Sequence, residues 1–284
     1  MKSILAFILF LSLSFNAFSQ TVKSSPVGVQ LYSFREQFKT DTRGTFQRVK
    51  DLGIKDVECA GFYDLTPQDF KKNLDEFGLK AIGCGVEFAE LEDETKLAKS
   101  IETAKLLGVK FVVCFWIPHV EGGFTLEEAQ KAIKVFNKAG KKLAENKLGL
   151  LYHPHGYEFR PYKDRYLMDL ILTETNPLYV NYEMDINWVF HAGHNPVTWL
   201  KRYPTRWKAM HIKDRKHSTP CNQFGRMDVE LNVAIGQGEV NTDDIMKTAR
   251  ALGIKHYFIE DESSRSFEQT PKSIDYLRQF FIKQ

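Results

Sequence analysis

Cysteine is scarce in this 284-residue sequence, and the spacing of its four cysteines excludes two classes of protein. Cys59, Cys84, Cys114 and Cys221 lie far apart and form no CxxC pair. A cysteine-type zinc finger and a disulfide-dense scaffold are therefore excluded. The first three cysteines lie inside apolar runs, so we expect buried free thiols there rather than disulfides.

An excess of charge of one sign is also missing. The chain has 39 Lys and Arg residues against 36 Asp and Glu residues, a formal net charge of +3. Nucleic-acid phosphates require a basic stripe, so we expect no nucleic-acid partner. The sequence also lacks the GxGxxG, GxxxxGK[ST] and GxSxG motifs, which leaves no evidence for a dinucleotide fold, a P-loop or a hydrolase elbow.

Long apolar runs are absent beyond the first residues. Residues 1–19 read MKSILAFILFLSLSFNAFS, with an early lysine, an apolar stretch and small residues where a signal peptidase cleaves. A buried N-terminal helix fits poorly, because the stretch has no polar face. The sequence therefore predicts a signal peptide over 1–19 and a mature domain over 20–284, exported to the periplasm or the extracellular space. The run is too short to span a bilayer comfortably and no cysteine follows it, so we expect no membrane anchor.

One short unit recurs along the mature chain. It consists of a glycine that closes an amphipathic stretch, followed by an apolar run rich in β-formers. Glycine adopts the left-handed conformation that ends a helix, and the residues after it enter a strand. The clearest copies are DLGIKDVE at 51–58, EFGLKAIG at 76–83, LLGVKFVV at 106–113 and ALGIKHYF at 251–258.

The recurring unit predicts a single (β/α)8 TIM barrel. Continuous apolar runs suit parallel strands that are covered on both faces, and helices are predicted over 97–107 and 126–143 from apolar residues three or four apart. Eight strands that alternate with helices favour a closed barrel over an open doubly wound sheet. The irregular stretch 213–241 is expected to form an active-site loop. The predicted strands are 27–32, 55–60, 80–86, 109–115, 148–153, 178–183, 207–212 and 255–260.

Ionisable side chains stand at nearly all predicted strand ends, where the active sites of such barrels lie. Asp185, His211 and Glu260 close three successive strands, so their side chains can meet on one ion. Imidazole and carboxylate ligands without thiolates suit a divalent ion such as Mn, Mg, Co or Zn. The fourth ligand is expected to follow the fifth strand, as either Glu158 or His153.

Other groups at the same strand ends are candidates for catalysis. His153 and His155 alternate along the chain, and the histidine that is not a ligand is expected to contact the substrate. Lys213 shares a strand face with His211 and can stabilise a developing oxyanion or act as a base when desolvated. Glu58 ends the second predicted strand and is a further catalytic candidate. Aromatic residues that can wall a sugar pocket are Tyr32, Trp116 and Trp188.

Six segments together resemble the sugar phosphate isomerase/epimerase family, the xylose isomerase-like TIM barrels, over 27–281. The segments are VGVQLYSFRE, YHPHGYEF, EMDINWVFHAGHNP, MHIKD, IGQGEVN and YFIEDE, in this order. The resemblance implies a metal site of Glu, Asp, His and Glu from strands five to eight, and Asp185, His211 and Glu260 match the last three. Many members carry the first Glu inside strand five, where this chain has Leu150, Leu151 and Tyr152.

The resemblance and the site together imply chemistry on a small sugar. A divalent ion stabilises the enediolate that forms when a hydroxy-ketone loses its α-proton. We therefore expect an exported metal-dependent isomerase or epimerase that acts on a neutral sugar or keto-sugar. A lyase that eliminates from a 3-keto-glycoside or keto-polyol shares the first step and is the main alternative. A non-catalytic sugar-binding barrel is a further one, and the sequence also allows a homo-oligomer. A nuclease of the endonuclease IV type is disfavoured by eight histidines and the small net charge.

Overall fold

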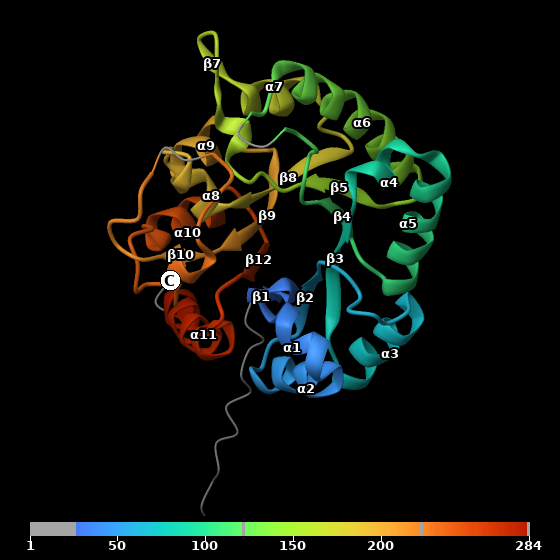
Figure 1. Cartoon of the computed structure of the whole chain (residues 1–284), viewed down its shortest axis with the longest axis vertical. Helices are drawn as coiled ribbons and strands as arrows, with labels where there is room; N and C mark the ends of the chain where they lie inside the picture. Colours follow the sequence, from blue (N-terminus) through green and yellow to red (C-terminus); the bar gives the residue numbers. More distant parts are fainter. Residues whose placement is uncertain (1–26, 121–122, 222–223, 283–284) are drawn as a thin grey trace, which may run out of the picture.

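Eight parallel strands close into a barrel in the computed structural model, which describes residues 27–120, 123–221 and 224–282. Figure 1 shows the strands at the centre of a ring of helices. The predicted signal peptide lies outside the described residues. In spatial order around the barrel, the strands are β1 (Val27–Gln30), β2 (Asp56–Cys59), β3 (Lys80–Val86), β4 (Phe111–Cys114), β5 (Gly149–Tyr152), β8 (Val180–Asp185), β9 (Trp207–Ile212) and β12 (His256–Ile259).

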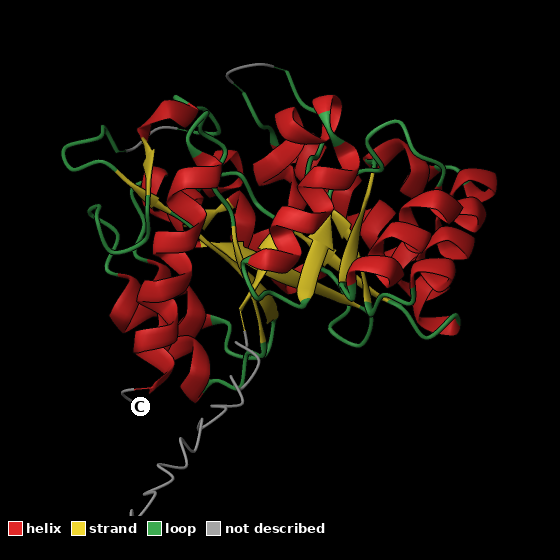
Figure 2. Ribbon diagram, turned by 90° about the horizontal axis from the view of Figure 1, so that it is seen from below, coloured by secondary structure: helices red, strands yellow, loops and turns green. Residues whose placement is uncertain are grey.

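Helices cover the outside of the barrel, so the strands lie inside them in the side view of Figure 2. The barrel expected from the recurring unit is confirmed, and the open sheet is excluded because β1 pairs with both β2 and β12. The α-helices are α1 (Arg35–Thr40), α2 (Thr42–Asp51), α3 (Pro67–Phe77), α4 (Phe88–Glu92), α5 (Glu94–Leu107), α6 (Leu126–Glu145), α7 (Leu167–Glu174), α8 (Ile186–His191), α9 (Pro196–Arg202), α10 (Thr242–Ala251) and α11 (Ser266–Ile282).

Local sequence explains where these helices begin and end. Helix α6 begins after Thr125, whose hydroxyl accepts the backbone N–H of Glu128 while the Glu128 carboxylate accepts that of Thr125. Helices α3 and α5 end at Gly78 and Gly108, with φ of 68° and 71°. Other residues are strained in this left-handed region, so the recurring glycine sets the boundary between helix and strand.

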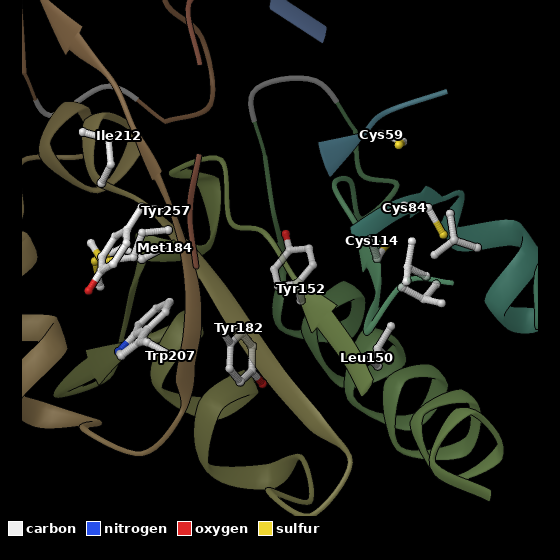
Figure 3. Packing of buried hydrophobic residues seen from close by; sticks show 14 of the residues in the cluster. Cys59, Cys84, Cys114, Leu150, Tyr152, Tyr182, Met184, Trp207, Ile212 and Tyr257 are labelled. Carbon is white, nitrogen blue, oxygen red and sulfur yellow. The ribbon is translucent and has the colours of Figure 1, made fainter. Parts of the chain in front are cut away.

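Two apolar layers hold the barrel together. Alternate strand residues point outward against the helices, and Figure 3 shows Tyr152, Tyr182 and Trp207 among them. The side chains between them point inward and form a small cluster of Ile82, Val113, Leu151, Ala209 and Phe258. This inner cluster fills the barrel interior, so any polar group beyond it lies at a mouth of the barrel.

The segment 213–241 has more structure than the expected irregular loop. Strands β10 (Asp214–Arg215) and β11 (Asn232–Val233) pair antiparallel, and the 3-10 helix η3 (Val229–Leu231) precedes β11. The buried Asp214 carboxylate accepts the backbone N–H groups of Gly236, Gly238 and Val240. The segment is therefore pinned to the end of β9.

The remaining short elements are the 3-10 helices η1 (Leu31–Phe34) and η2 (Tyr157–Phe159) and the hairpin of β6 (Pro161–Tyr162) and β7 (Arg165–Tyr166). The expected free thiols are confirmed, since Cys59, Cys84 and Cys114 are buried and form no disulfide. Within the described ranges, no helix has the length and apolar character needed to cross a membrane.

Candidate active site

The strand register brings ionisable side chains together above the inner cluster. Asp185 at the end of β8 is the direct neighbour of His211 on β9. Small residues leave room in the same layer, because Gly83 is the register partner of Glu58 and Ala209 is the partner of Glu183. A side chain in place of Gly83 would meet the Glu58 carboxylate at 2.8 Å. The glycine therefore allows Glu58 to point into the barrel.

His211 lies at the centre of this layer and is fully buried. Its Nε2 is 2.7 Å from Glu58 Oε2 and 3.1 Å from Glu183 Oε2. Its Nδ1 is 3.0 Å from Glu260 Oε2. The ring thus links a deeper pair of carboxylates on one side with Glu260 on the other.

His153 follows β5 and lies beside His211, with ring centroids 4.4 Å apart. Its Nδ1 is 3.2 Å from Glu183 Oε2, and its Nε2 is 3.9 Å from Asp185 Oδ2. Each histidine therefore turns one ring nitrogen to Glu183 and the other to a carboxylate at the strand ends. Each of three residues, His153, Asp185 and His211, offers one ligand atom, and these three atoms lie within 4.8 Å of one another.

Lys213 is a buried cation at the same mouth, not a surface lysine. Its ammonium nitrogen is 2.8 Å from Glu260 Oε2, 2.6 Å from Glu262 Oε1 and 3.4 Å from Asp185 Oδ2. Burial opposes its charge, but these carboxylates outweigh burial and raise the pKa of Lys213 well above its usual value. The side chain therefore stays cationic at neutral pH.

The electrostatics of the layer separate the two histidines that follow β5 from His211. Burial lowers the pKa of His153 well below its usual value and that of His155 to about 3, so both rings are neutral. For His211, burial is outweighed by Glu183 and Glu260, which raise its pKa well above the usual value. Positive charge is thus favoured where His211 meets the carboxylates.

These residues fit a divalent metal ion. Asp185 Oδ2 and Glu183 Oε1 are buried and have no hydrogen-bond partner in the described part of the chain. Burial raises the pKa of both carboxyl groups, that of Glu183 to about 8 with a contribution from Glu58. The Lys213 ammonium offsets part of this cost at Asp185, a divalent cation there would offset more, and imidazole with carboxylate suits Zn, Mn, Co or Mg. A second group of closely spaced ligand atoms consists of Glu58, Glu183 and His211, so His211 belongs to both groups.

Glu158, one of the two expected fourth ligands, lies apart from these groups. Its carboxylate accepts hydrogen bonds from the Tyr152 hydroxyl and from the backbone N–H of His155. Tyr152 points outward and packs on Phe136 of α6, so Glu158 folds back to the outside of the barrel. Glu158 therefore lies outside both groups of spaced ligand atoms, whereas His153, the other expected fourth ligand, belongs to one of them. The identity of the fourth ligand stays a prediction.

The buried Glu158 predicts a pH-dependent stability. Burial raises its pKa from 4.5 to about 7, so its contribution is complete below the unfolded value and is lost as the pH rises through about 7. Relative to wild type, Glu158→Gln should become more stable at alkaline pH, by roughly 3 kcal/mol at the limit. Urea unfolding at several pH values measures this difference, and the exposed Glu174→Gln serves as a control. Parallel stability profiles for wild type and Glu158→Gln would contradict the prediction.

Aromatic residues and His155 surround the mouth unevenly. Trp188 is buried. The centroid of its ring lies 5.5 Å from the Lys213 ammonium nitrogen and 5.5 Å from the centroid of the His155 ring. Trp116 also contacts His155 and is 43% exposed, while Tyr32 is 40% exposed. Nδ1 of His155 and Nε1 of Trp188 are buried and have no hydrogen-bond partner among the described residues. In the part of the chain that the structure describes, His155 and Trp188 thus each hold one buried polar atom without a partner near the mouth.

For three residues of the site, the sequence predicts a position near a strand end but no role. Glu183 touches both histidines of the ligand group, Glu262 bonds Lys213, and Gln30 donates to Glu58 Oε2 at 2.7 Å. Glu183 had one available signal. It lies two residues before Asp185 on the same strand, so both side chains point to the same face.

The fold and this cluster define a TIM-barrel enzyme with its site at the carboxyl ends of the strands. A family model described as xylose isomerase-like TIM barrel matches residues 46–280. The chain belongs to this family, and it is an enzyme of the xylose isomerase-like superfamily.

Named relatives and solved structures agree with this placement. An inosose dehydratase of Mesomycoplasma hyopneumoniae strain J is 26% identical over 205 residues, which cover 70% of this chain and 62% of the relative. The chain thus matches somewhat less than two thirds of the length of that relative. A sugar phosphate isomerase/epimerase structure from Parabacteroides distasonis has a TM-score of 0.76, 25% identity and coverage of 91% of this chain and 97% of its own. A structure of the IolI protein with a zinc atom has a TM-score of 0.70 at 16% identity, covering 90% of this chain and 96% of its own.

Proposed function

We propose that this protein is a divalent-metal-dependent lyase that removes water or another β-substituent from a keto-polyol or a 3-keto-glycoside. One observation carries the proposal. The ligand group of His153, Asp185 and His211 adjoins a neutral histidine with a free nitrogen, His155, and a buried cation, Lys213. An elimination next to a ketone needs a base for the α-proton and positive charge for the developing oxyanion.

The metal site proposed here consists of His153, Asp185, His211 and Glu260. When bound, a divalent ion polarises the ketone oxygen and makes the neighbouring C–H more acidic. The side chains hold the substrate and manage the proton. Lys213, fixed by Glu260 and Glu262, places its ammonium beside the site and stabilises negative charge on the substrate oxygen.

His155 is the proposed acid and base. Its neutral ring takes the proton from the carbon next to the ketone, and the electron pair of that C–H bond forms a C=C bond as the β C–O bond breaks. The resulting imidazolium returns the proton to the departing hydroxyl group, which leaves as water. The buried wall of Trp188 beside His155 keeps bulk water from the ring.

The named relatives support elimination over the isomerisation expected from the sequence. The relative is named inosose dehydratase, and this name describes an enzyme that removes water from an inosose, which is a keto-polyol. A keto-polyol offers both features that the site requires, a ketone oxygen for an ion and a hydroxyl group at the β-carbon. We therefore place the lyase reaction ahead of the isomerase reaction for this chain.

Isomerisation or epimerisation is the second candidate, and a specific likeness favours it. The Parabacteroides structure named sugar phosphate isomerase/epimerase is 25% identical and covers nearly the whole chain. The first step would be the same removal of the α-proton. The two candidates differ only in whether the proton returns to carbon or leaves with the β-substituent.

Proton NMR in deuterated water separates the candidates. Protein loaded with Zn or Mg is incubated with a keto-inositol, a 3-keto-glucoside or a hexose phosphate. The lyase predicts loss of the α-proton signal together with an unsaturated product from the keto-inositol or the keto-glucoside. The isomerase predicts an isomer of the hexose phosphate or of another keto-sugar that carries deuterium at carbon.

A site variant provides the matched control. His155→Ala should retain the ion, because its ring is outside the ligand group, and should lose both exchange and product. Absence of both α-proton loss and product from every substrate, with the ion bound, would refute both enzymatic candidates. It would favour the non-catalytic sugar-binding barrel.

We also propose that the chain is exported and acts outside the cytoplasm. The support is the sequence of residues 1–19, with its apolar stretch and its small residues before Gln20. Mass spectrometry of the protein expressed from its native start in a Gram-negative host tests this. Cleavage should remove about 19 residues, as expected for a signal peptide, and an intact Met1 on the exported protein would refute it.

A further inference from the structure

Glu183 contacts both histidines of the proposed metal site through a single oxygen atom. Its Oε2 is 3.2 Å from His153 Nδ1 and 3.1 Å from His211 Nε2. The side chain is fully buried. Glu183 shares a strand face with Asp185, so β8 supplies both a proposed ligand and the group behind two further ligands.

The contact with Glu183 determines which nitrogen of each ring is left to bind a metal. The nitrogens that face away from Glu183 are His153 Nε2, near Asp185, and His211 Nδ1, near Glu260. An imidazole that donates from one nitrogen keeps a lone pair on the other, which is the form that binds a metal. One shared acceptor therefore leaves the second nitrogen of each ring turned to a carboxylate at the strand ends, His153 to Asp185 and His211 to Glu260.

We propose that Glu183 is the positioning residue of the metal site: it accepts from His153 Nδ1 and His211 Nε2, so that the opposite nitrogen of each ring is the one left to bind the ion. The inference rests on the proposed function for the ion itself. The role needs an acceptor oxygen, not a charge, because Oε2 of a carboxyl group can accept hydrogen bonds whether or not the other oxygen carries a proton. Glu183 is not expected to contact the substrate.

Glu58 has a related but narrower role. Its Oε2 is 2.7 Å from His211 Nε2 and also accepts a hydrogen bond from Gln30. Neither of the contacts that place Glu58 involves His153. His153 is therefore the residue whose tautomer reports on Glu183 alone, whereas His211 has two acceptors at the same nitrogen.

The test compares Glu183→Met with Glu183→Gln. Met removes the acceptor at similar length, while the amide oxygen of Gln retains it. Glu183→Met should weaken Zn binding about 10- to 100-fold, the usual effect of losing an outer-shell partner, and Glu183→Gln should recover most of the affinity. Isothermal titration with Zn measures the affinity, and Asp169→Asn, a buried carboxylate on α7, is the control for loss of a buried acid.

Nitrogen-15 NMR of histidine-labelled protein supplies a readout without the ion. In the wild type, His153 should carry its proton on Nδ1. The proton should move or become mobile in Glu183→Met and stay in place in Glu58→Met. A wild-type spectrum with the His153 proton on Nε2 would overturn the inference, even if Glu183→Met fails to fold. Wild-type Zn affinity in a folded Glu183→Met variant would overturn it as well.

These readouts separate the inference from the proposed function. If the wild type binds no divalent ion, the metal-dependent lyase is refuted. The spectrum of His153 then still decides whether Glu183 fixes the ring. If the wild type binds Zn and Glu183→Met binds it equally well, the positioning role fails while the lyase proposal stands.

Discussion

The His211→Ala variant is expected to lose both the bound ion and the turnover while the barrel stays folded. The His211 ring reaches Glu58, Glu183 and Glu260, and its nitrogens lie 2.7–3.1 Å from their oxygens. Removal of a direct ligand should weaken ion binding more than about 100-fold, because loss of an outer-shell partner already costs 10- to 100-fold. Metal analysis after dialysis against Zn or Mn, with turnover of a keto-inositol, measures both effects.

Folding should survive because His211 lies above the inner apolar cluster and is not part of it. The matched control is His256→Ala, a histidine at the opposite, amino-terminal end of β12. It should change neither metal content nor turnover. If circular dichroism shows that His211→Ala is unfolded, His211→Gln keeps an amide donor in the layer and repeats the test. A folded His211 variant with wild-type metal content would refute the proposed ligand set.

The Lys213→Met variant is expected to lose turnover and keep the ion. Its ammonium is the cation that lies beside Asp185 and Glu260 at the mouth, and loss of such a stabilising group lowers kcat about 10²- to 10³-fold. Ion binding should be equal or tighter, because the cation that competes for the same two carboxylates is gone. Titration with Zn and steady-state kinetics on the loaded protein separate the two effects.

Lys208→Met is the control, on the strand that Lys213 directly follows. Lys208 is exposed at the beginning of β9 and donates to the Thr205 carbonyl, away from the site. Its replacement should leave kcat and ion affinity unchanged. A Lys213→Met variant that loses the ion along with turnover would show that the lysine acts through the metal site and not on the substrate.

The barrel was predictable because its signals are local. The glycines that end α3 and α5, the apolar stripe of α6 and the runs of β-formers each depend on neighbours within a few residues. The predicted strand 207–212 coincides with β9, and the helix predicted over 126–143 is α6 within two residues. The pairs in 213–241 were not predictable in this way, because strands of two residues carry no periodicity.

In the candidate site too, some residues could be placed from local sequence, whereas others depend on tertiary packing. Asp185, His211 and Glu260 could be placed together from sequence, because adjacent parallel strands end at the same side of a sheet. Whether a residue in the loop after β5 turns inward or outward depends on packing, and Glu158 turns outward to the Tyr152 hydroxyl. His153, one residue after β5, keeps the alternation of the strand and points inward.

The sequence by itself determined the repeating unit, the strand ends and the kinds of ligand at those ends, since these depend on residue type and short-range spacing. The tertiary structure alone decided that Glu58 meets His211 across 153 positions of the chain and that Glu183 bridges two histidines. It also decided that Lys213 is buried among three carboxylates. These contacts depend on how the closed barrel staggers its strands and on the space that Gly83 and Ala209 leave open, and neither follows from local sequence.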